Sequence, residues 1–142
     1  MRSTLPAKTL NFNMEAHANA LNWFEIPAAD MERARTFYSA ILGEPMGEVE
    51  DAGRLKKSYF PTGSTMDNIV GGALAHSPYH TPSMQGSVIY LNANPSIQAI
   101  LDRVDAAGGK VMLPRTDIGN DIGFMASFAD TEGNMVSLHA RN

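Results

Sequence analysis

The chain has 142 residues, of which 44% are hydrophobic and 18% charged, so it is long enough for one domain with a buried core. A net charge of −4 with scattered basic residues argues against a nucleic-acid partner, and the lack of cysteine excludes disulfides, thiolate nucleophiles and cysteine-based zinc sites. No apolar run approaches the roughly 18 residues that a membrane span needs, so we expect a soluble cytoplasmic protein.

The first residues carry basic side chains but no continuous apolar segment, which argues against a secretory signal. We interpret residues 1–19 as an N-terminal tail, with Met14 as an alternative start of translation. The folded domain is expected over residues 20–142.

Residues 21–43 contain the clearest local pattern. The segment WFEI (23–26) predicts a short strand that ends at Pro27, and Asp30 is a favourable helix N-cap. Gly43 is a favourable residue for the end of the helix. The apolar residues between them fall on one helical stripe: Met31, Ala34, Phe37, Tyr38, Ile41 and Leu42.

Three strands and a loop rich in Pro, Ser and His are predicted to follow this helix. The strands cover residues 46–50, 55–60 and 68–76, and the loop covers residues 76–85.

A second copy of the same pattern begins at Gly86. Residues 87–92 predict a strand, and Asn94 followed by Pro95 predicts a helix start. The apolar stripe of this helix is Ile97, Ile100, Leu101 and Val104, and three more strands are predicted over residues 110–113, 122–128 and 134–140.

The two halves align at four landmarks. Trp23 falls on Ser87, Asp30 on Asn94, Gly43 on Gly108 and His76 on His139, with offsets between 63 and 65 positions. The alignment predicts two βαβββ modules, over about residues 20–80 and 86–142, in a single domain.

With this repeat in place, the sequence resembles the vicinal-oxygen-chelate superfamily, which includes glyoxalase I, bleomycin-resistance proteins and extradiol dioxygenases. The likeness extends from Leu21 to the end of the chain, over about 120 residues. It is carried by WFEIPAADMERARTFYSAILG (23–43), GGAL (71–74), AAGGKV (106–111) and FADTEGNMVSLH (128–139). The resemblance implies an α+β fold whose two modules form a curved, mixed eight-stranded sheet, a cup around a small-molecule ligand. It also implies a homodimer, with each cup often built from both chains.

Enzymes of this family hold a divalent metal with four side chains, one on the first and one on the last strand of each module. Carried over by position, these are Trp23, Leu74, Ser87 and Ser137. None is His, Asp or Glu, and Trp and Leu cannot coordinate a metal. We therefore expect no metal cofactor, and a cup that binds a small, partly apolar molecule.

Residues two positions further along each strand face the same side, because side chains alternate along a strand. These are Glu25, His76, Ile89 and His139. Glu25, His76 and His139 form an alternative set of ligands for a divalent metal ion, as in a lyase, isomerase or dioxygenase. Without metal, Glu25 and His139 are expected to pair as a polar handle or general acid–base, with both pKa values moved toward neutrality.

Five residues are further candidates for ligand contact. Trp23 is a stacking platform, and Met125 is an adaptable apolar wall. Arg115 is a clamp for a carboxylate or phosphate. Ser87 and Ser137 complete the predicted wall.

Purely structural roles are alternatives for several of these residues. Trp23 is also typical of ordinary core packing, and Arg115 of a surface ion pair with Asp117 or Asp121. Tyr90 is expected on the face opposite the cup, and His80 is expected to be exposed. A cup filled by its own side chains would leave the dimer surface as the functional part.

Overall fold

The computed structural model describes residues 19–62 and 69–142, and within them strand, helix and three strands follow one another twice. The α+β fold of two βαβββ modules is therefore confirmed. The first module comprises β1 (Trp23–Pro27), α1 (Met31–Leu42), β2 (Glu50–Asp51), β3 (Lys56–Tyr59) and β4 (Gly71–His76). The second comprises β5 (Tyr90–Asn92), α2 (Ile97–Val104), β6 (Lys110–Asp117), β7 (Phe124–Ala129) and β8 (Met135–Ala140). Met14, like the rest of residues 1–18, lies outside the described residues.

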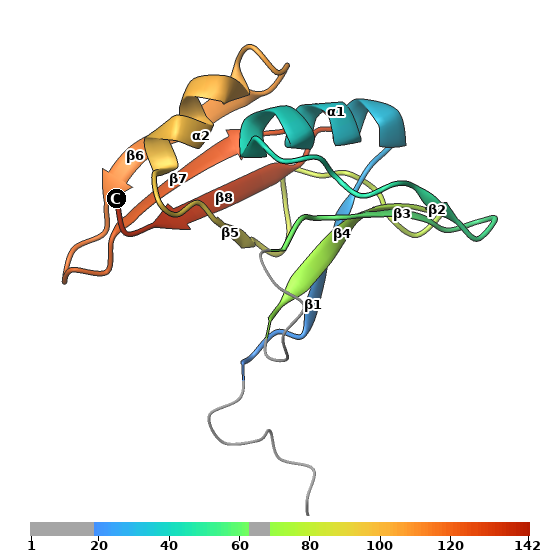
Figure 1. Ribbon diagram of the computed structural model, residues 1–142, viewed down its shortest axis with the longest axis horizontal. Helices are drawn as coiled ribbons and strands as arrows, with labels where there is room; N and C mark the ends of the chain where they lie inside the picture. Colours follow the sequence, from blue (N-terminus) through green and yellow to red (C-terminus); the bar gives the residue numbers. More distant parts are fainter. Residues whose placement is uncertain (1–18, 63–68) are drawn as a thin grey trace, which may run out of the picture.

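Each module builds one mixed four-stranded sheet. The strand orders are β1-β4-β3-β2 in the first sheet and β5-β8-β7-β6 in the second. In both sheets the first and last strands of the module pair in parallel, and the other pairs are antiparallel. The strands thus form two hydrogen-bonded sheets rather than one continuous ladder. Both helices lie on the same side of the strands (Figure 1), and we call the opposite side of each sheet its free face.

Helix α1 forms as its sequence predicts. The Asp30 side chain accepts a hydrogen bond of 3.0 Å from the backbone N–H of Arg33, and Gly43 ends the helix with a left-handed φ of 72°. Met31, Ala34, Phe37, Tyr38 and Ile41 are all buried, as the stripe predicts.

Helix α2 begins later than predicted. Its N-cap is Ser96, whose hydroxyl accepts a hydrogen bond of 3.3 Å from the backbone N–H of Ala99. The predicted cap, Asn94, instead accepts a hydrogen bond of 2.8 Å from the backbone N–H of Arg141. The prediction was wrong because two capping residues lie close together, and the contact with the C-terminal segment is not visible in local sequence.

Several strands differ in length from the prediction. β5 begins at Tyr90 rather than at residue 87, and β2 is reduced to Glu50–Asp51. β6 continues to Asp117, past the predicted end at Leu113. Shifts in the β6–β7 register, one of them between Leu113 and Thr116, allow the strand to pass Pro114.

A buried polar joint connects the two modules. The Tyr38 hydroxyl of α1 donates a hydrogen bond of 2.7 Å to the Asp130 carboxylate, which also accepts from the side-chain amide of Asn134 at 2.9 Å. The same amide donates to the Pro27 carbonyl at 2.7 Å. Glu132 accepts from the backbone N–H of Asp30 at 2.7 Å and therefore holds the start of α1. The turn between β7 and β8 thus fixes the first helix onto the second module.

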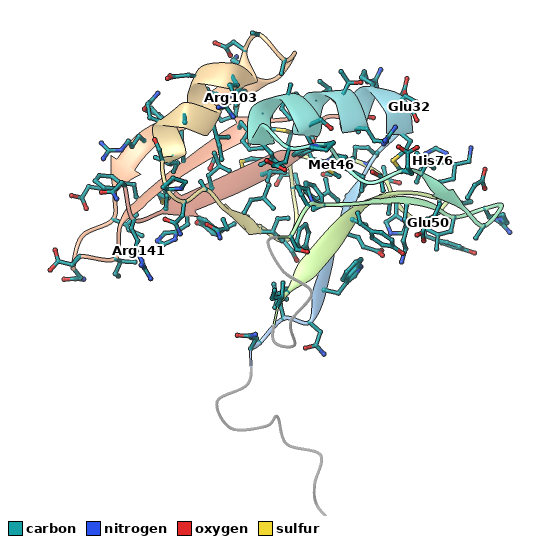
Figure 2. The ribbon with its side chains drawn as sticks, in the orientation of Figure 1. Glu32, Met46, Glu50, His76, Arg103 and Arg141 are labelled. Atoms are coloured by element: carbon teal, nitrogen blue, oxygen red, sulfur yellow. The ribbon has the colours of Figure 1, made fainter. Side chains whose placement is uncertain are left out.

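One apolar core continues through both modules. Phe37 of α1 packs against Phe128 of β7 with ring centroids 5.8 Å apart, and Tyr38 contacts Phe60 at 5.2 Å. Figure 2 shows Arg103 of α2 reaching toward α1, where it donates a hydrogen bond of 3.2 Å to the Ile41 carbonyl. No helix among the described residues is long and apolar enough to cross a membrane.

Candidate functional site

Equivalent hydrogen bonds define which positions of the two modules correspond. The backbone N–H of Ala28 donates to the Ala75 carbonyl at 2.9 Å, and that of Ala93 donates to the His139 carbonyl at 2.8 Å. Ala28 is therefore equivalent to Ala93, and Ala75 to His139. The offset is 65 positions on the first strands and 64 on the last.

This correspondence corrects two of the four metal-ligand positions that were carried over from the family, namely Ser87 and Leu74. Counting back along the strands, Trp23 is equivalent to Val88, and Ala73 is equivalent to Ser137. Ser87 therefore lies one position before the equivalent site, and Leu74 lies one position after it. Leu74 is fully buried, and the alternation of side chains turns it to the helix side of the sheet.

Glu25 is the centre of a polar cluster on the free face of the first sheet. Its carboxylate accepts hydrogen bonds from Lys57 at 2.9 Å, from His80 at 2.7 Å and from the indole N–H of Trp23 at 3.2 Å. Trp23 also contacts the ring of Tyr59 edge-on, with centroids 5.7 Å apart. The cluster joins β1, β3 and the loop that follows β4.

The electrostatics of this cluster keep Glu25 ionised. Partial burial acts to raise the pKa of the carboxyl, but hydrogen bonds from Lys57, His80 and Trp23 outweigh it and lower the pKa to about 2. The expectation that pairing would move this pKa toward neutrality was therefore wrong. At neutral pH Glu25 is therefore a negative charge and a hydrogen-bond acceptor.

His80 is the residue of this cluster that the sequence prediction missed. It was expected to be exposed, but it is half-buried, with Nε2 on Glu25 and Nδ1 2.7 Å from the Ser77 hydroxyl. The local signal was weak, because a histidine in a loop of Pro and Ser indicates nothing about a partner 55 positions earlier.

His76 does not join Glu25. Glu25 is level with Ala73 across β1 and β4, and His76 lies three positions further along β4, so the two side chains leave opposite faces of the sheet. Figure 2 shows His76 on the α1 side, where its Nδ1 lies 2.8 Å from the Ala28 carbonyl. The predicted set of Glu25, His76 and His139 is therefore not assembled, and the described part of the chain contains no group of three or more His, Cys, Asp or Glu residues placed to hold a metal.

His139 lies on the free face of the second sheet, apart from Glu25. Its Nε2 is 2.9 Å from the Ile122 carbonyl, which can only accept, so Nε2 carries the proton. The Nδ1 atom of the neutral ring is then a hydrogen-bond acceptor. The predicted direct pairing of Glu25 with His139 is not present: the two residues lie on different sheets, and each has another partner, His80 and the Ile122 carbonyl respectively.

A groove lies beside His139. It has a volume of about 450 Å³. Tyr90 is level with Ser137 in the β5–β8 register, so it shares the free face with His139, contrary to the prediction. The groove residues are Tyr90, Leu91, Asn92, Asn94, Ile118 and His139.

Met125 and Ser137 line the same face of the second sheet. Met125 is level with His139 in the β7–β8 register, as its predicted role as a wall requires. Ser137 is buried, and its hydroxyl lies 2.9 Å from that of Ser127. Ser137 therefore already has a hydrogen-bond partner within the sheet.

Arg115 is not among the residues that line the groove. Its guanidinium is 3.6 Å from the centroid of the Phe124 ring, which packs on the α2 side of the sheet. This cation–π contact, rather than an ion pair with Asp117 or Asp121, is what the structure records for Arg115.

Two other hollows differ in whether predicted site residues line them. One of about 150 Å³ lies between the modules and is lined by Glu25, Ser87 and Asn134 among others. The other, of about 320 Å³, is lined by apolar residues including Phe24, Phe60 and Leu91. None of the predicted site residues lines this second hollow.

Comparison with known proteins agrees with the geometry. The chain is 28% identical over 120 residues to the anthracycline biosynthesis protein DauV of a Streptomyces species, covering 78% of this chain and 43% of that protein. It is 28% identical over 125 residues to the putative glyoxylase CFP32 of Mycobacterium bovis, covering 85% and 45% respectively. The chain thus spans less than half the length of these relatives. A glyoxylase-like domain-containing protein of Didymella fabae is 27% identical over 121 residues, covering 85% of this chain and 93% of that protein.

Solved structures show the same fold. A glyoxalase/bleomycin resistance protein from Albidiferax ferrireducens superposes with a TM-score of 0.64 at 19% identity, covering 87% of this chain and all of that one. Glyoxalase I from Zea mays superposes with a TM-score of 0.61 at 18% identity, covering 85% of this chain and 46% of that one. The family model of the Glyoxalase/Bleomycin resistance protein/Dioxygenase superfamily matches residues 20–138. The chain belongs to this superfamily.

Proposed function

We propose that the protein binds a small, partly apolar molecule in a cup that contains no metal, and that the groove beside His139 is the centre of this cup. The supporting observation is the chemistry of the four positions where enzymes of this family hold their metal. By the hydrogen-bond correspondence these are Trp23, Ala73, Val88 and Ser137. Of these, only Ser137 has a side-chain oxygen, and a neutral hydroxyl is a weak ligand for a first-row divalent ion.

The free face of the second sheet has the composition of a small-molecule site. Tyr90, which is 51% exposed, and Met125 offer apolar and aromatic surface. The Nδ1 atom of His139 and the side chain of Asn92 add polar groups. Apolar walls with a few placed polar groups are typical of sites that bind small organic molecules.

The metal-dependent alternative receives no support from side-chain placement. Its ligand set requires Glu25 and His76 on one face, and the first sheet separates them. The name of the Streptomyces relative, an anthracycline biosynthesis protein, is compatible with a planar organic ligand.

A binding experiment with a defined probe tests this function. The full chain is titrated with 8-anilinonaphthalene-1-sulfonate, with and without a chelator, and fluorescence reports binding. Tyr90→Ala is expected to weaken binding by about tenfold, because losing an aromatic contact costs about 1–2 kcal/mol, while the chelator has no effect. Tyr79→Ala, at a residue 86% exposed on a loop, is the matched control and is expected to bind like the wild type. Equal loss in both variants, or loss with the chelator alone, would refute the proposal.

We also propose that the active form is a cytoplasmic homodimer. The free faces carry large apolar side chains that remain exposed in one chain, among them Trp23 at 42% and Tyr90 at 51%. Exposed aromatic residues of this kind mark ligand or subunit contacts. Light scattering on the full chain is expected to give twice its mass of 15.3 kDa. A single-chain mass at every concentration would reject the dimer.

A further inference from the structure

A continuous hydrogen-bonded chain connects a hydroxyl, an imidazole and a carboxylate on the first module. The Ser77 Oγ atom lies 2.7 Å from Nδ1 of His80, and Nε2 of His80 lies 2.7 Å from Oε1 of Glu25. Ser77 and His80 belong to one turn after β4, closed by a hydrogen bond from the backbone N–H of His80 to the Ser77 carbonyl at 3.2 Å. Glu25 comes from β1, on the neighbouring strand.

The positions of the protons follow from the chemistry of these groups. An ionised carboxylate only accepts hydrogen bonds, so Nε2 of His80 donates to Glu25. When the ring is neutral, its Nδ1 atom carries a lone pair, and the Ser77 hydroxyl donates to it. The order is hydroxyl to imidazole to carboxylate. This is the arrangement of an activated nucleophile, its base and an orienting acid, with the two ring nitrogens exchanged relative to the serine protease triad.

The hydrogen-bonded series of Ser77, His80 and Glu25 is held rigidly at both ends. The second carboxylate oxygen of Glu25 is fixed by Lys57 at 2.9 Å and by the indole N–H of Trp23 at 3.2 Å. At the other end, the Ser77 oxygen accepts a hydrogen bond of 3.0 Å from the backbone N–H of Tyr79. This N–H also stabilises negative charge on the oxygen when the hydroxyl loses its proton. The imidazole is therefore oriented on both sides before any substrate arrives.

We propose that Ser77 is a nucleophile that accepts acyl groups from small activated esters, with His80 as its base and Glu25 as a positioning residue for His80. Ser77 is half-buried and its neighbour Tyr79 is 86% exposed, so this turn is open to solvent. The site is separate from the groove beside His139 and independent of the proposed ligand binding there.

The reaction balances without a metal or a redox partner. The Ser77 Oγ atom forms a bond to the ester carbonyl carbon as its proton passes to Nδ1 of His80. The bond between that carbon and the leaving oxygen then breaks, and His80 returns the proton to the leaving alkoxide. Water attacks the acyl-serine with His80 again accepting a proton, and the carboxylic acid leaves as Ser77 recovers its hydrogen.

Acetylation by p-nitrophenyl acetate tests the proposal on the full chain. We expect a burst of p-nitrophenolate equal to about one acetyl group per chain, with peptide mass spectrometry placing the acetyl group on Ser77. His80→Gln is expected to slow acetylation by about 10²–10⁴-fold, the usual contribution of a general base. Ser83→Ala, in the same loop, is the matched control and keeps the wild-type burst.

Glu25 is tested by the pH profile of acetylation. Glu25→Gln is expected to slow the reaction and to move the midpoint of the profile to lower pH, because the imidazolium loses its counter-charge. A merely structural role for Glu25 would leave the midpoint unchanged. The location of the label in the wild-type chain decides the main question without any variant. An acetyl group on His80 or Lys57 instead of Ser77, or no label above that of the unfolded chain, would overturn the proposal.

Discussion

The ring of Phe24 lies directly over Gly72 on the neighbouring strand, so close that a Cβ atom at position 72 would stand 2.5 Å from Cδ1 of the ring. Real Cβ atoms do not approach a ring carbon so closely, and Phe24 is half-buried against the core. Position 72 therefore requires glycine because the Phe24 ring occupies the space of a side chain, and not because the backbone has an unusual conformation.

Gly72→Ala is accordingly expected to lower the free energy of unfolding by about 1–3 kcal/mol, the usual cost of overpacking a core. Gly71→Ala is the matched control, because a Cβ there would meet Trp23 at an ordinary 3.5 Å. That variant is expected to stay within about 0.5 kcal/mol of the wild type. Urea unfolding of both variants measures the difference, and equal stability would contradict the packing described.

The buried joint between the modules gives a second prediction. Tyr38→Phe removes the hydrogen bond to Asp130 and leaves a buried carboxylate with one partner fewer. Hydrogen bonds to charged groups contribute about 1.5–3 kcal/mol, and we expect a loss of that size in urea unfolding. Tyr59→Phe removes a similar bond to Glu50 at the exposed surface, and a loss below about 1 kcal/mol is expected there. A smaller effect at Tyr38 than at Tyr59 would show that the joint does not stabilise the fold.

The lowered pKa of Glu25 predicts how stability depends on pH. The pKa of the Glu25 carboxyl is about 2 in the folded protein, compared with 4.5 when the group has no folded surroundings. The ionised carboxylate therefore contributes stability above pH 4.5, and this contribution is lost as pH falls toward 2. After allowance for solvent screening of this half-exposed group, the contribution is about 1–2 kcal/mol. Glu25→Gln is therefore expected to be less stable than the wild type at neutral pH, with the gap closing near pH 2.

Unfolding measured across this pH range tests the effect. Glu48→Gln is the control, because the Glu48 side chain is 98% exposed and its substitution is expected to change stability by less than about 0.5 kcal/mol. A gap between wild type and Glu25→Gln that stays constant with pH would assign the effect to packing instead of charge.

Local chemistry made much of the fold predictable. Asp30 and Gly43 mark the ends of α1 by capping alone, and the buried stripe follows from helical periodicity. The second helix was placed less well, because the choice between Asn94 and Ser96 depends on a contact with Arg141. The offset between the modules was also predicted one position too short on the first and on the last strands, and this moved two of the predicted metal-ligand positions by one residue.

The site was less predictable than the fold for a physical reason. The face to which a strand residue points follows from the local sequence, because side chains alternate along a strand. The partner of that side chain, however, depends on which distant loop packs against the sheet. Glu25 was recognised as a polar residue of the free face, whereas His80 reaches it through a turn 55 positions later. Tyr90 was assigned to the wrong face because Trp23 was aligned with Ser87 instead of Val88, and a slip of one residue reverses every face along a strand.

Binding of an organic molecule in the cup without a metal ion can be observed directly. Native mass spectrometry of the full chain, purified without chelator or affinity-tag histidines, tests it most directly. We expect a folded species that retains or takes up an organic ligand and carries no stoichiometric divalent metal. A metal ion retained at one equivalent per cup, and required for the ligand to stay bound, would contradict it.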